Sequence, residues 1–225
     1  MQAQDATTIY LLKLWPWIEE NKKAIGIGAA IICVVVFFFW FSSVQHTQKE
    51  TSAGNAMSQL LVSRTGESSD AYLKIASDYS GTVAAQRATI QAAVLLFGQG
   101  KYTDAQAQFQ KFIDGNPDSQ FYIQALYGNA ACLAAENKPQ DAIAAYQHVI
   151  NSSSAGPEVN SSKFAVGGIE ESQGRLNDAV TYYEDVASAD PSGMLGAEAR
   201  QRLMELHSQT QGTGASPSSP LQLKR

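Results

Sequence analysis

The sequence predicts an all-α protein in which one N-terminal transmembrane helix is followed by an α-solenoid of about four helix pairs and a capping helix. Three observations predict this fold class. A frame of turn, Asp, Ala, aromatic and apolar residues returns twice at a spacing of 37 residues. Within each frame the apolar positions are spaced like one face of a helix. Finally, residues 24–44 contain no charged residue.

The N-terminal part is predicted to be a short leader, residues 1–23, and a membrane-spanning helix, residues 24–44 (AIGIGAAIICVVVFFFWFSSV). At about 1.5 Å per residue the span reaches about 31 Å, close to the hydrocarbon thickness of a bilayer. Trp15 and Trp17 precede it and Trp40 and Phe41 lie at its far end, as interfacial aromatic residues do. A cleaved signal peptide is the alternative. However, the apolar block exceeds a signal h-region and ends in bulky FFFWF rather than at a small-residue cleavage site.

The charges beside the span predict its orientation. Lys22 and Lys23 directly precede it, whereas Lys49 and Arg64 follow at a greater distance. The positive-inside rule then places the N-terminus in the cytoplasm. The predicted location is the bacterial inner membrane, crossed once, with residues 45–207 in the periplasm.

The repeat frame is clearest in residues 100–117, GKYTDAQAQFQKFIDGNP. Each of its copies places an Ala four positions before an aromatic residue: Ala105 and Phe109, Ala142 and Tyr146, Ala179 and Tyr183. A small Ala is needed where a second helix crosses closely, and the aromatic ring fills the space one turn later. A less regular copy, with Gly66, Asp70, Ala71 and Ile75, precedes these three.

Each copy reads as helix, short turn, helix. The repeat domain, residues 45–207, therefore divides into repeats at about 52–85, 86–119, 123–156 and 160–193, with a capping helix at 194–207. The Gly/Ser/Pro-rich residues 208–225 are predicted to be a disordered tail.

On these residues the sequence resembles the tetratricopeptide repeat family, over roughly residues 51–191. The family's A-x3-F…P signature is met by Ala105, Phe109 and Pro117 and again by Ala179, Tyr183 and Pro191. The first helices depart from the family pattern. Smaller or charged residues replace its large ones at the usual Trp and Tyr positions: Thr89, Leu126 and Lys163, and Glu170.

The resemblance implies a peptide-binding groove formed by positions two, five and nine of each unit. In this sequence those positions are Arg87, Ile90, Val94, Gln124, Tyr127, Ala131, Ser161, Phe164 and Gly168. With one Arg, this set does not suit the carboxylate clamp of the family's chaperone-tail binders. Ile90, Tyr127 and Phe164 form either an apolar row in the groove or part of the core, and both readings stay open.

No catalytic, metal or cofactor chemistry is expected, and the protein is not predicted to be an enzyme. His46, His148 and His207 are far apart, and no Cys/His spacing suits zinc. The Gly-rich stretches lack the Lys-Ser/Thr of a phosphate loop. The net charge of −5, without a basic stripe, excludes a nucleic-acid partner.

One membrane anchor followed by about four such repeats and a cap resembles the ancillary SecYEG translocon subunit family, as does the leader–anchor join WIEENKKAIGIG. This resemblance implies an adaptor that assists proteins at the Sec translocon on the periplasmic side. Its implied partners are translocon subunits, periplasmic chaperones or client polypeptides. The alternative function is a structural scaffold for another cell-envelope complex, such as division or secretion machinery.

Overall fold

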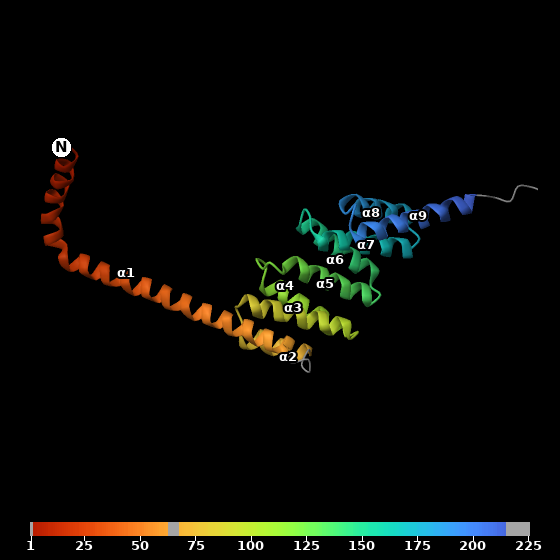
Figure 1. Ribbon diagram of the computed structural model, residues 1–225, viewed down its shortest axis with the longest axis horizontal. Helices are drawn as coiled ribbons and strands as arrows, with labels where there is room; N and C mark the ends of the chain where they lie inside the picture. The colour runs from red at the N-terminus through yellow and green to blue at the C-terminus, as the bar shows by residue number, and fades with distance from the viewer. Residues whose placement is uncertain (1, 63–67, 215–225) are drawn as a thin grey trace, which may run out of the picture. The chain divides into compact units, whose positions relative to one another are not determined.

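A computed structural model of the protein describes residues 2–62 and 68–214. Every regular element in these residues is an α-helix (Figure 1). The helices are α1 (Gln2–Val62), α2 (Ser69–Asp78), α3 (Val83–Gly98), α4 (Tyr102–Gly115), α5 (Tyr122–Ala135), α6 (Pro139–Ser152), α7 (Pro157–Ser172), α8 (Leu176–Ala189) and α9 (Met194–Gly214). The chain divides into two compact units, Met1–Gly54 and Asn55–Arg225.

In the first unit, α1 runs without a break through the predicted leader and span, so the boundary predicted at residue 45 is not a helix end. No proline lies between the span and Val62, and the hydroxyls of Thr47 and Thr51 donate to carbonyls one turn earlier at 3.0 and 2.9 Å. Ile32, Phe38 and Trp40 are 65 %, 69 % and 62 % exposed. By length and composition, the segment Glu19–Val62 qualifies as a membrane-crossing helix.

In the second unit, each of the helices α2 to α9 packs against the next one along the chain (Figure 1). Helices α3, α5, α7 and α9 also contact one another, whereas among the described residues α2, α4, α6 and α8 do not. The odd-numbered helices therefore form a close-packed inner row, and the even-numbered helices form an outer row. Each helix pair contacts only its neighbours, which is the packing of an α-solenoid.

The turns inside the pairs α3–α4, α5–α6 and α7–α8 are each closed by a residue with a left-handed backbone. Gly100, Asn137 and Gly174 have φ angles of 75°, 58° and 74°. The N–H of the residue that follows each of them donates, at 2.9–3.0 Å, to a carbonyl five positions earlier. This Schellman arrangement satisfies the last helix carbonyls, and Gly and Asn adopt its left-handed conformation at the lowest cost. The recurring turn residue is therefore a backbone requirement.

The predicted crossing positions are in the core. Ala105, Ala142 and Ala179 have 0 % exposure, and the aromatic residues four positions later are 1–3 % exposed. Burying such an aromatic side chain contributes about 1.5–3 kcal/mol. The Ala and aromatic positions of the frame are therefore buried on α4, α6 and α8.

The first repeat differs from its prediction. Helix α2 begins after Ser68, whose Oγ accepts a hydrogen bond from the N–H of Ala71 at 3.1 Å. Tyr72 and Ile75 are buried, but Ala71 is only half-buried, so Ala71 is not a crossing position. The predicted turn residue Gly66 lies outside the described residues.

The C-terminal helix is longer than predicted. Helix α9 runs to Gly214, so disorder predicted for residues 208–214 is wrong. These residues precede Pro217, and nothing before that proline removes a backbone N–H from the helix. The rest of the predicted tail, residues 215–225, lies outside the described residues.

Candidate protein-binding groove

All nine predicted groove residues lie on the inner row, on α3, α5 and α7. Arg87 and Val94 are exposed on α3. Six residues on α5 and α7 are half-buried: Gln124, Tyr127, Ala131, Ser161, Phe164 and Gly168. Part of the surface of these six residues is covered, because α5 and α7 each pack between neighbouring helices on both sides. The groove as a binding site stays a prediction.

Ile90 does not belong to an accessible groove. It is 2 % exposed and lies in a core cluster with Leu96, Phe109 and Phe112. Because α4 packs over this part of α3, the side chain is enclosed between the two helices. For Ile90 the core reading is therefore correct, and the groove assignment is corrected.

Tyr127 and Phe164 lie between the core and the accessible surface of the inner row. The Tyr127 ring lies 5.7 Å from that of Tyr146, and the Phe164 ring lies 5.2 Å from that of Tyr183, both in tilted geometry. Such aromatic pairs contribute about 0.5–1.5 kcal/mol beyond area burial. One face of each ring thus supports the core, and the half-buried remainder is open to a partner. Burial, with a smaller contribution from Glu158, raises the pKa of Tyr127, so its phenol stays a neutral hydrogen-bond donor.

A cavity of about 430 Å³ lies at the C-terminal end of the inner row, and Phe164 and Gly168 line it. Its other lining residues come from the end of α7, from α8 and from α9: Glu171, Ser172, Leu176, Tyr183, Arg202 and Gln209. The volume is in the range of ordinary ligand pockets. Phe164 and Gly168 are the predicted groove residues that line this cavity.

A buried phenol, that of Tyr183, holds the Glu171 carboxylate of this cavity in place by a hydrogen bond. Tyr183, 1 % exposed, donates from its hydroxyl to Oε2 of Glu171 at 2.8 Å. Burial and this hydrogen bond raise the pKa of Tyr183, so the phenol remains a donor at neutral pH. Arg202 also lines the cavity, and its Nη1 lies 3.5 Å from Oε2 of Glu205 on the same helix. The cavity therefore offers one apolar wall, one anion and one cation to a polypeptide side chain.

Sequence reasoning did not find the contribution of α9. Extending the 37-residue frame from α7 gives Glu198, Gln201 and Glu205, not Arg202. The side chain that reaches the cavity depends on how α9 is rotated against α7. No signal in the sequence reports that rotation.

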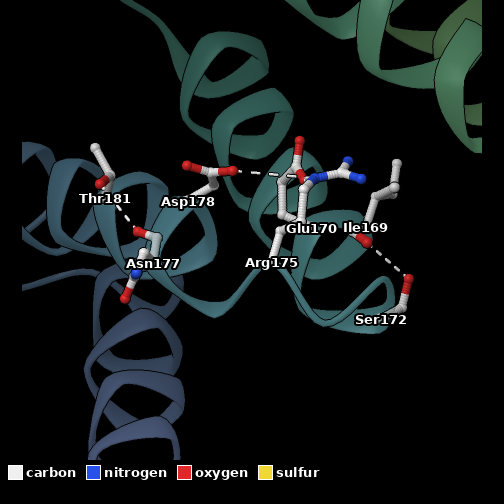
Figure 2. Close-up of polar contacts among 7 residues, drawn as sticks. All are labelled: Ile169, Glu170, Ser172, Arg175, Asn177, Asp178 and Thr181. Carbon is white, nitrogen blue, oxygen red and sulfur yellow. Dashed lines mark hydrogen bonds and ion pairs between the residues drawn. The ribbon is translucent and has the colours of Figure 1, made fainter.

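Glu170 and Glu171 have different partners: Glu171 accepts from the Tyr183 hydroxyl, whereas Glu170 pairs with Arg175. Glu170, 8 % exposed, forms an ion pair with Arg175, whose Nε also lies 4.0 Å from Oδ2 of Asp178 (Figure 2). The equivalent positions 37 residues earlier are Leu133 and Lys138. The departure from the repeat pattern at Glu170 is thus compensated by the guanidinium in the following turn.

Within the described residues, no three His, Cys, Asp or Glu side chains are grouped as a metal site would require. The thiol of Cys132 is buried, and burial, with a smaller contribution from Glu136, raises its pKa from 9.0 to about 12. A thiol with so high a pKa is not a nucleophile at neutral pH. The described chemistry is that of a binding surface.

A solenoid of helix pairs with a partly apolar inner row is the architecture of repeat proteins that bind other polypeptides. The family model of the tetratricopeptide repeat-like domain matches residues 16–189, and the chain belongs to this family.

Among solved structures, the chain is similar to two crystal structures of nearly identical TPR-like repeats from a Podosopora anserina protein named for the kinesin light chain, one of them a point variant. The TM-scores are 0.48 and 0.47 at 14 % identity. The matches cover 76 % and 77 % of this chain and 92 % and 94 % of those chains. A search of curated proteins found no match.

Proposed function

We propose that the protein is a membrane-anchored adaptor, without enzymatic activity, that binds polypeptides at the Sec translocon on the periplasmic side of the inner membrane. The observation that carries this proposal is the presence, in one chain, of a long exposed apolar helix and a tetratricopeptide repeat-like solenoid. Water does not tolerate a contiguous exposed apolar surface of this kind, whereas a bilayer does. The anchor keeps the binding surface at the membrane, where emerging polypeptides are met.

The inner row supports the choice of a protein partner. Its accessible parts combine half-buried aromatic rings with isolated charges, and aromatic and Arg side chains are the usual anchors of protein interfaces. The net charge of −5 gives no attraction to nucleic acid. Translocon subunits, periplasmic chaperones and client polypeptides are the proposed partners.

Site-specific crosslinking in a bacterial cell tests this function. A photoreactive residue at Ala131, on the inner helix α5, should give adducts with translocon subunits and emerging polypeptides. The matched control is Ala144, exposed on the outer helix α6, which should not give the same adducts. A fixed set of envelope components at Ala131 would favour the scaffold alternative, and no adduct there would contradict the adaptor.

A further inference from the structure

The outer row contains a groove that the inner-row site does not use. Helices α2 and α4 both pack on α3, but among the described residues they do not contact one another. The space between them is a cavity of about 610 Å³, lined by residues such as Leu73, Ser77, Gln86, Gln108 and Lys111. A second cavity, of about 440 Å³, lies along the α4–α5 loop and shares Gln86 and Asn116 with the first. We call the two adjoining cavities the outer groove.

The side-chain amides shared by the two cavities are held in fixed orientations. Gln86 donates from Nε2 to Oδ1 of Asn116 at 3.3 Å and accepts from Oγ of Ser119 at 2.8 Å. Asn116 donates from Nδ2 to the carbonyl of Phe112 at 3.0 Å. Each NH₂ group has two N–H bonds, so these contacts use one on each residue. The other N–H of each amide can donate to a ligand carbonyl that enters the cavity.

The rest of the outer groove suits an extended chain. Phe112, 2 % exposed, and half-buried Leu73 supply an apolar floor. Lys111 is the one charged side chain lining the first described cavity, and Asp118 is the one lining the second. An extended polypeptide presents main-chain N–H and C=O groups along its edges and side chains on alternate faces. The fixed amides can pair with the ligand's main-chain groups, while the apolar floor contacts side chains on one face of the ligand.

We propose that the outer groove binds an extended polypeptide segment through its main chain, with an acidic side chain of that segment beside Lys111. The proposal rests on the proposed function as a polypeptide-binding protein, and it names a second site and a mode of recognition. Because the amides pair with main-chain groups, the only sequence preference expected of the ligand is for an acidic residue beside Lys111. The protein then has two contact surfaces for polypeptides, one on the inner row and one on the outer row.

The test measures peptide binding to the full chain in detergent by fluorescence anisotropy. The probe is a labelled, end-blocked octapeptide, Ser-Thr-Val-Ser-Glu-Val-Thr-Ser, and its matched probe carries N-methyl groups on alternate amides. We expect the first to bind and the second to lose at least about tenfold in affinity, because the N-methyl groups block the close extended approach that brings the ligand carbonyls to the Gln86 and Asn116 amides. Gln86→Leu should weaken binding by about tenfold as well.

Charge reversal gives a second test of the proposal, because a variant that merely failed to fold would not gain affinity for a peptide of opposite charge. Lys111→Glu, at an exposed position, should weaken binding of the probe and strengthen binding of the same peptide with Lys in place of Glu. The control Gln91→Leu, exposed elsewhere on α3, should change neither, and melting curves check that all variants fold. Equal binding by Gln86→Leu, Lys111→Glu and the original chain would overturn the proposal, as would binding lost only on Phe164→Ala.

The two proposals fail separately. Adducts at Ala131 in cells together with no peptide binding in the outer groove would leave the adaptor function and remove the second site. Peptide binding with the expected charge reversal, but without translocon adducts, would remove the Sec assignment and keep the outer groove.

Discussion

Gly128 of α5 lies directly against the ring of Phe109 on α4: a Cβ atom added at Gly128 would be 2.3 Å from Cζ of that ring. Phe109 is 2 % exposed and enclosed by the core cluster of the second repeat, so its ring has no space into which to move. The absence of a side chain at position 128 is what lets α5 approach α4 this closely.

Gly128→Ala should therefore destabilise the solenoid by about 1–3 kcal/mol, because overpacking outweighs the gain in helix propensity. Gly98→Ala is the matched control. A Cβ there meets nothing within 4 Å, so this change should leave the stability unchanged or raise it slightly. Urea unfolding of the full chain in detergent, followed by circular dichroism, measures both. Equal midpoints for the two variants would contradict the close approach.

The ion pair of Glu170 with Arg175 gives a double-mutant cycle. Arg175→Ala should lower the urea midpoint, because it leaves the nearly buried Glu170 carboxylate without its partner. Glu170→Leu combined with Arg175→Lys reproduces the Leu133 and Lys138 pair of the preceding repeat and should restore the urea midpoint. If the double variant were as unstable as Arg175→Ala, the ion pair would not be the compensation that we infer.

The solenoid should lose stability at alkaline pH. Burial raises the pKa of Cys132 to about 12 and raises those of Tyr146 and Tyr183 as well. Unfolded thiols and phenols titrate at about 8.5–10, so above that pH the unfolded chain releases protons that the folded chain keeps. This contribution is fully present below about pH 8 and is lost as the pH rises toward the folded pKa values.

Melting curves between pH 7 and pH 11 measure this loss, and Cys132→Ala should remove part of the slope above pH 9. A thiol reagent supplies a second check on burial. The rate at which the reagent modifies the buried Cys132 in the folded chain should be far lower than the rate at which it modifies the exposed Cys33 in detergent-denatured protein. A melting temperature that is flat across this pH range would show that these groups are not buried as described.

The proposed orientation rests on Lys22 and Lys23 beside the apolar segment. A reporter enzyme that is active only in the periplasm should be active when fused after His207. The same reporter fused after Lys23 should be inactive. Activity of a cytoplasm-only reporter after His207 would reverse the assignment.

Tyr127 and Phe164 separate a binding role from a structural one. The double change Tyr127→Ala with Phe164→Ala should lower the melting temperature only modestly, because each ring is half-exposed. Crosslinking from Ala131 to the membrane partner should be lost, since an aromatic anchor contributes about 2 kcal/mol or more at an interface. A folded double variant with full crosslinking would place the binding surface elsewhere.

The sequence alone determined the repeat register. Ala142 must be small where helices cross, and Asn137 and Gly174 must adopt a positive φ, and both requirements are local and steric. Each requirement restricts the residue type at its own position, so its 37-residue recurrence is visible without any structure. The apolar segment of α1 is recognised in the same way, since its composition and length are enough.

Only the tertiary structure decided what each surface residue faces. Ile90 and Phe164 hold equivalent positions in the frame, yet one is enclosed by α4 and the other lines a cavity beside α9. The gap between α2 and α4, which forms the outer groove, likewise has no counterpart in the frame. Exposure depends on how neighbouring helices rotate and separate, and that follows from the summed packing of many side chains rather than from one residue type.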